Sequence, residues 1–119
     1  MLIRYLKTIT LQRIIPTKAT NGQYVNSYED VERYRVMKEE LTSEVDAEVY
    51  GSDINKIQRI KSPKGDLEQY LYDRLNNKED NVSKYVISDG NAKYKIKAVN
   101  PYKVDIERIW EIYQQCRFF

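Results

Sequence analysis

The 119-residue sequence contains no histidine and a single cysteine, Cys116. Without histidine the chain lacks the usual general base near neutral pH and the commonest metal ligand, so it cannot build a Ser-His or Cys-His nucleophile. One cysteine excludes an intramolecular disulfide. Only four glycines are present, and neither a GxxxxGK[ST] nor a GxGxxG phosphate-binding motif occurs. These absences predict a protein that is not an enzyme and binds no metal or cofactor.

Long apolar runs are also missing. No segment approaches the ~18 consecutive apolar residues of a membrane-spanning helix, and the N-terminal MLIRYLKTIT lacks the apolar core of a signal peptide. We therefore predict a cytoplasmic chain with no membrane association. The length predicts a single domain over residues 1–119. Eleven tyrosines, against two phenylalanines and one tryptophan, favour β structure and protein contacts.

Alternating polar and apolar residues predict several strands. Residues 7–15 and 44–50 each show the period of a half-buried strand. The clearest pattern lies at 83–100, where Asp89-Gly90 supplies the tight turn of a β-hairpin. These segments favour a mainly β domain, either a small antiparallel barrel or a sandwich.

The remaining segments are less decisive. The first strand should stop at Pro16, and the proline and small polar residues of 16–27 predict a turn or loop. Residues 28–41 fit either a helix capped by Ser27 or a strand, and 104–113 fit either type of element.

One short helix is predicted at 66–75, beginning at Asp66 as its cap. An exposed turn is predicted at 76–81. The apolar residues that share one face of this helix are Leu67, Tyr70, Leu71 and Leu75.

Residues 53–65 are a concentrated basic segment in a nearly neutral chain, whose formal net charge is +2. The segment carries four basic residues against one acid, with three isoleucines interleaved at three-residue spacing. A merely solvated loop would not need these isoleucines, so we predict a functional loop that ends at the breakers Pro63 and Gly65. Its candidate site residues are Ile54, Lys56, Ile57, Arg59, Ile60, Lys61 and Lys64.

Other charged and aromatic positions allow more than one interpretation. Lys93, Lys95 and Lys97 form a basic hairpin face that either meets phosphates or is solvated and guards against edge pairing. Asp46 and Glu48 are predicted to be solvated. The two C-terminal phenylalanines either pack on their own domain or dock on a neighbour. These candidate interface residues are Phe118 and Phe119.

Three short motifs occur in a characteristic order. They are Leu11-Gln12-Arg13 in the first strand, Asp46-Ala47-Glu48 in a middle strand and Tyr94-Lys95-Ile96 in the late hairpin. In order and spacing, over about residues 7–113, the chain resembles the head closure, or stopper, proteins of long-tailed bacteriophages. It departs from that family in a longer arm at 24–41, in Asp46 where a tryptophan is common, and in the charged segment 66–81.

The resemblance implies a mainly β fold, a small SH3-like antiparallel β-barrel with a long loop and one short helix. It implies a head-tail connector in the virion neck, assembled in the host bacterial cytoplasm, that closes the DNA channel after packaging and provides the tail docking surface. The implied partners are further copies in a hexameric or dodecameric ring, the portal or adaptor protein, the tail terminator or tail tube protein, and packaged double-stranded DNA. Residues 51–66 would project into the channel as a gate, with loop-to-loop contacts between the isoleucines.

Two other functions fit the same residues. A tail-completion or terminator protein of the neck shares the size and the ring assembly. A small nucleic-acid-binding β-barrel would use the basic loop in the same way. We also expect the isolated chain to be monomeric or weakly associating, because its charged, tyrosine-rich sequence lacks the long apolar stripe of an obligate oligomer. Docking side by side on a connector would raise the effective concentration of the copies and so form the ring.

Overall fold

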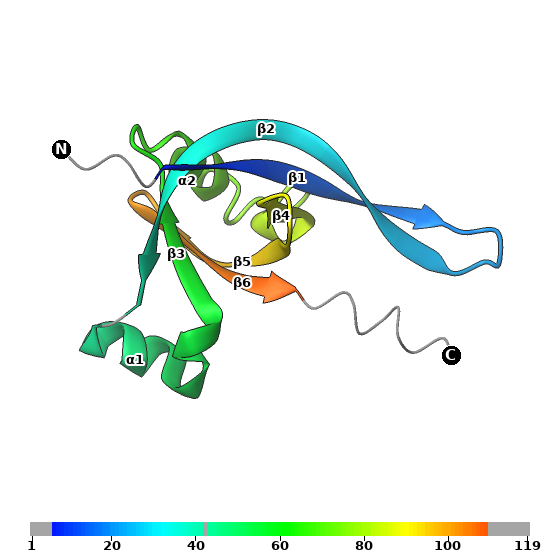
Figure 1. Ribbon diagram of the computed structural model, residues 1–119. Coiled ribbons are helices and arrows are strands. Elements are labelled where there is room, and N and C mark those ends of the chain that lie inside the picture. Colours follow the sequence, from blue (N-terminus) through cyan, green and yellow to red (C-terminus); the bar gives the residue numbers. More distant parts are fainter. Residues whose placement is uncertain (1–5, 42, 110–119) are drawn as a thin grey trace.

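The computed structural model describes residues 6–41 and 43–109, and Figure 1 shows a small barrel from which a long ribbon extends to one side. In these ranges six antiparallel strands close into a barrel in the order β1-β2-β3-β6-β5-β4. The predicted mainly β fold and small antiparallel barrel are confirmed. The strands are β1 (Lys7–Lys18), β2 (Tyr24–Glu40), β3 (Ile57–Lys61), β4 (Tyr85–Ser88), β5 (Lys93–Asn100) and β6 (Lys103–Ile109).

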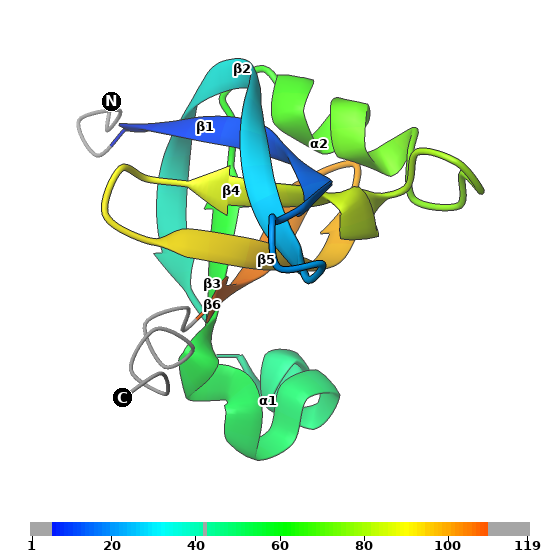
Figure 2. The same cartoon turned by 90° about the vertical axis from the view of Figure 1, so that its right-hand side faces the viewer.

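The barrel is filled by apolar side chains from every strand. Leu11 of β1 and Ile87 of β4 are fully buried and are cross-strand partners. Helix α2 (Asp66–Tyr72) adds Leu67 and Leu71 to the same core, and Figure 2 shows this helix beside the barrel. Burial of each such side chain is worth roughly 1.5 to 3 kcal/mol, so the core supplies the main driving force for folding.

The β1–β2 hairpin is longer than the sequence predicted. β1 continues through Pro16 to Lys18, and β2 begins at Tyr24, so the loop predicted at 16–27 shrinks to a turn at 19–23. Proline is tolerated there because β1 pairs with β4 only as far as Arg13, which leaves one edge of the strand free beyond that point. The undecided segment 28–41 is a strand.

Residues 44–50 form a helix, α1 (Glu44–Tyr50), and the predicted strand is wrong. Ser43 caps this helix, because its side chain accepts a hydrogen bond from the Asp46 N–H, and acidic residues occupy the first turn. Gly51, at φ 58°, ends it. Local capping therefore outweighs the alternating pattern. Seven residues are too few to distinguish the period of a strand from that of a helix.

The long loop predicted at 53–65 is also wrong. A 3-10 helix, η1 (Gly51–Lys56), leads directly into β3, which pairs with β2 on one side and β6 on the other. The chain leaves the strand at Ser62 and turns into α2, whose N-cap is Gly65 rather than the predicted Asp66. Residues 6–41 and 43–109 thus contain two short α-helices where the sequence predicted one.

The late hairpin is confirmed. A short 3-10 helix, η2 (Val82–Lys84), precedes β4, and the chain reverses with Gly90 at φ 94° before β5 begins. The described part of 104–113 is strand β6, while its end and the C-terminal positions Cys116, Phe118 and Phe119 lie outside the described residues.

Candidate functional site

The most distinctive surface is the part of the β1–β2 hairpin that extends beyond the barrel. β1 pairs with β4 only over Thr10–Arg13, and β2 pairs with β3 only from Met37 onward. Residues 14–28, here called the ribbon, are therefore two strands paired only with each other. Figure 1 shows the ribbon reaching away from the barrel. A two-stranded ribbon is marginally stable in water, so contacts with a partner would stabilise it.

The tip of the ribbon exposes large apolar side chains. Tyr24 is 71% exposed and Val25 is 52% exposed, both at the start of β2. At the barrel end the ribbon is held instead, since the Lys93 ammonium lies 4.3 Å from the centroid of the Tyr28 ring. The ribbon is thus held at its base and exposed at its tip.

A second exposed apolar surface lies on α1. Val45 and Val49 are each 67% exposed and are four residues apart, so they share one side of the helix. Figure 1 shows α1 and the ribbon tip at opposite ends of the molecule, and in Figure 2 α1 lies below the barrel.

A buried polar cluster fixes α1 to the barrel. Arg59 of β3 donates to Asp46 of α1 at 2.9 and 3.2 Å and to Asp105 of β6 at 2.7 and 3.0 Å. Tyr50, at the end of α1, donates its hydroxyl to Asp105 at 2.5 Å. Four of the five guanidinium N–H groups are thus bound by two carboxylates, and this network positions α1 against the barrel.

The cluster shifts the pKa values of Asp46 and Tyr50. Hydrogen bonding from Arg59, and then from Ser43, holds the pKa of Asp46 below its ordinary value. Burial, followed by the bond to Asp105, raises the pKa of Tyr50, which keeps its hydroxyl protonated as a donor. The prediction that Asp46 is a solvated strand residue is wrong, while Glu48 is exposed as predicted.

The predicted gate residues are dispersed. Ile57 and Ile60 are core residues, 4% and 2% exposed, and Arg59 is buried in the cluster. The predicted loop-to-loop contacts of Ile57 and Ile60 are therefore wrong. Ile60 belongs to the barrel core, and Ile57 is buried on the opposite face of β3, which also carries Arg59. The sequence signal that could have revealed this is the short run Ile57–Lys61 with its β-branched residues, which the basic charge obscured.

The other members of the same segment differ in their exposure and in their partners. Lys61 pairs with Glu39 at 3.1 Å, and Lys56 pairs with Asp53 at 3.6 Å. Ile54 is half-buried in η1. Lys64 is exposed, and within residues 6–41 and 43–109 no acid lies at ion-pair distance from it.

Lys64 borders a cleft of about 370 Å³ that opens where β2 separates from β3. The cleft is also lined by Arg33, Arg35 and the carboxylate-bearing Asp66. Neither arginine forms an ion pair with a described residue. Sequence reasoning missed these two arginines because the cleft depends on where two strands diverge.

The basic hairpin face has partners for each of its lysines. Lys95 and Lys97 both lie 3.5 Å from Glu107 of β6, and a bulge between Ile96 and Ala98 breaks their alternation. Lys93 donates to Gln12 at 2.7 Å. This face is a cross-strand network rather than a set of free cations.

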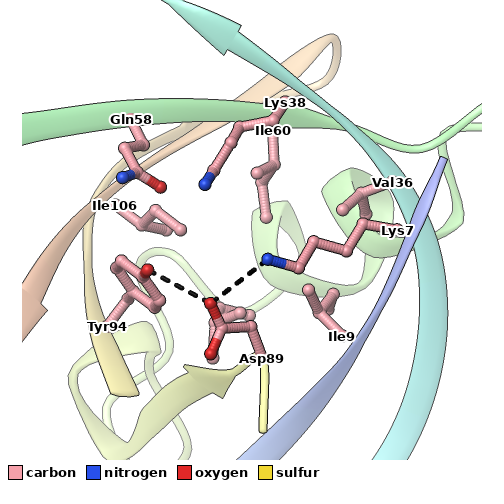
Figure 3. Close-up of a pocket in the computed structure, with 10 residues that line it drawn as sticks. Lys7, Ile9, Val36, Lys38, Gln58, Ile60, Asp89, Tyr94 and Ile106 are labelled. Atoms are coloured by element: carbon pink, nitrogen blue, oxygen red, sulfur yellow. Dashed lines mark hydrogen bonds and ion pairs between the residues drawn. The ribbon is translucent and has the colours of Figure 1, made fainter. Parts of the chain in front are cut away.

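The open end of the barrel is closed by polar side chains (Figure 3). Lys7 pairs with Asp89 at 3.5 Å, and the Tyr94 hydroxyl donates to Asp89 at 3.2 Å. The cavity behind them measures about 20 Å³, enough for about one water molecule. The Gln58 Oε1 atom is buried there without a hydrogen-bond partner among the described residues.

The described ranges contain no group of three or more metal-ligating side chains that could hold an ion. Neither helix in those ranges has the length and apolar character needed to cross a membrane.

Comparison with known proteins finds no family model and no curated protein that matches the chain. Among solved structures it is similar to protein SF1141 from Shigella flexneri 2a, with a TM-score of 0.47 and 17% identity over 91% of this chain and 95% of that one.

Proposed function

We propose that this chain is a non-catalytic structural subunit of a phage neck. In this role it forms a hexameric or dodecameric ring below the portal or adaptor, closes the channel over packaged DNA and offers a docking surface to the tail terminator or tail tube. The observation that carries the proposal is the ribbon, which projects from a closed barrel and leaves the apolar residues at its tip without cover from the same chain.

The closed barrel limits how such a subunit can associate. Where the barrel is closed its strands are paired on both sides, so assembly depends on elements outside the closed part, including the edges of β1 and β2 that β4 and β3 leave unpaired. The ribbon and α1 are those elements, and both expose apolar side chains. Exposed apolar patches of this kind are typical of contact surfaces between proteins.

The resemblance to head closure proteins supports the proposal in part. Leu11-Gln12-Arg13 lies on β1 and Tyr94-Lys95-Ile96 on β5, the elements expected for these motifs. Asp46-Ala47-Glu48 lies on α1 instead of a strand, so this motif belongs to the outer surface and the Arg59 cluster. In this role, contact with channel DNA falls to Lys64 and the two cleft arginines rather than to Arg59, which is buried among carboxylates.

The function can be tested in the genome that encodes the chain. Deleting the coding sequence should yield particles whose heads are assembled but lack tails or lose their DNA, as seen by electron microscopy. Supplying the wild-type chain in trans should restore tailed, DNA-filled particles. Infectious tailed particles formed without the chain would contradict the proposal.

A further inference from the structure

The tip of the ribbon has two different faces, which the strand register identifies. Lys18 is the cross-strand partner of Tyr24, and Thr17 is the partner of Val25. Opposed residues share a face of a hairpin, whereas successive residues alternate between faces. Lys18 and Tyr24 therefore lie together on one face, and Val25 lies on the other.

The exposed side of α1 has matching chemistry. Val45 and Val49 form an apolar stripe, and the exposed Glu44 and Glu48 form an acidic stripe one residue, or about 100°, around the helix. Asp46 points inward to Arg59, which keeps both stripes turned away from the barrel.

The ribbon tip and α1 of the same chain are too far apart to contact each other. Figure 1 shows the ribbon tip and α1 at opposite ends of the molecule, and Figure 2, seen from the ribbon side, shows α1 below the barrel. Lys18 is the single charged residue in 14–28 and has no ion-pair partner among the described residues. Both the apolar and the charged groups are thus free to meet a second copy.

We propose that the Lys18/Tyr24 face of the ribbon docks on α1 of a second copy, with Tyr24 on the Val45/Val49 stripe and Lys18 beside the two glutamates. The contact is head-to-tail, because each copy donates a ribbon and receives one, and such contacts generate a ring when the rotation between copies closes. The inference deepens the proposed function, although the contact itself requires no phage component.

The two patches are small, and this limits the affinity of one chain for another. A contact of this size is weak between free chains and is strengthened when neighbours are held side by side on a connector. The experiment therefore traps the contact covalently instead of relying on a stable oligomer.

Cross-linking of the full chain tests the contact directly. In a Cys116→Ser background, the variant Tyr24→Cys/Val49→Cys should form an oxidant-dependent ladder of dimers and larger species on non-reducing gels. Mixing the two single-cysteine chains should give one heterodimer and no ladder, since each chain carries one half of the contact. Val25→Cys/Val49→Cys is the matched control, because residue 25 lies on the opposite face of the same tip, and it should give no ladder.

Charge reversal tests the orientation. Lys18→Glu, added to the cross-linking variant, should abolish the ladder, and Glu44→Lys/Glu48→Lys in the same chain should restore it. Circular dichroism should show every variant folded, since the side chains substituted at positions 18, 24, 25, 44, 48 and 49 are exposed.

Equal cross-linking through positions 24 and 25, or no ladder from the Tyr24→Cys/Val49→Cys chain, would overturn the inference. The proposed function would survive that result if particles lacking the chain still lost tails or DNA. Conversely, the ladder could form from Tyr24→Cys/Val49→Cys while a genome without the coding sequence still gives normal particles. That pair of results would support the contact and refute the neck function.

Discussion

At the scale of single residues, Arg59 connects three elements through two carboxylates. Its bonds to Asp46 and Asp105 are short and nearly fully buried, so the cluster satisfies its own polar groups. A buried charge that is stable when paired becomes costly when its partner is removed. The position of α1 therefore depends on a residue in the middle of the sheet.

We expect Arg59→Met to destabilise the protein by about 3 kcal/mol, because it leaves two buried carboxylates without their counter-ion. Urea unfolding at neutral pH measures this change. Lys56→Met is the control, since it breaks an exposed pair with Asp53 and should cost less than about 1 kcal/mol. Equal effects of the two substitutions would show that the Arg59 cluster does not hold the fold together.

The lowered pKa of Asp46 predicts that the stability of the protein depends on pH. Its folded pKa lies below the ordinary value, so its contribution to stability is complete above that value and is lost as the pH falls through the folded pKa. The free energy of unfolding should therefore fall as the pH is lowered from about 5 toward about 2, and it should fall less in Asp46→Asn. Urea unfolding across this range is the measurement, with Asp53→Asn as the surface control. An unchanged pH dependence in Asp46→Asn would contradict the assignment.

At the scale of elements, β3 and the ribbon reverse the roles that the sequence suggested for them. The basic segment contributes a central strand with neighbours on both sides, and the segment interpreted as a loop becomes a paired ribbon. The reason is that a closed barrel requires a strand between β2 and β6. The isoleucines of 57–61 fill that place.

Ile60 tests the role of β3. Ile60→Ala should destabilise the protein by about 2 to 5 kcal/mol, as expected for a cavity in a packed core. Ile54→Ala, at the half-buried position of η1, is the matched control and should cost less, because more of that side chain is already in water. Both values come from chemical unfolding. An Ile60→Ala variant with the same free energy of unfolding as the wild type would contradict the core role of β3.

At the scale of the whole molecule, the arrangement separates two kinds of surface. The apolar ribbon tip and α1 lie at opposite ends, which suits assembly. Three cations without an ion pair among the described residues, Arg33, Arg35 and Lys64, line the cleft between β2 and β3. Paired lysines are partly neutralised by their partners, so free arginines should dominate contact with a polyanion.

We expect duplex DNA to bind weakly at low salt through the cleft. Arg33→Gln/Arg35→Gln should lower the slope of log affinity against log salt by about two. Lys95→Gln/Lys97→Gln removes the same charge from lysines that pair with Glu107 and should change the slope less. Fluorescence anisotropy with a labelled duplex measures both. Equal losses would show that only the net charge matters.

The sequence by itself determined the mainly β class, the Asp89-Gly90 hairpin and the apolar face of α2. These features are local, since a glycine at positive φ or an apolar repeat along one helix acts over a few neighbouring residues. The exposure of Lys64 and Glu48 also agrees with their polarity.

Only the tertiary structure decided the rest. Beyond the local Ser43 cap, the placement of Val45 on an outward-facing helix depended on the Asp46 bond to Arg59, a residue 13 positions away. The core role of Ile57 and Ile60 depended on β2 and β6, which lie far along the chain. The ribbon exists because β4 and β3 each pair with only part of their neighbours. Such contacts join distant residues, and a short sequence pattern carries no information about which distant strand will be its neighbour.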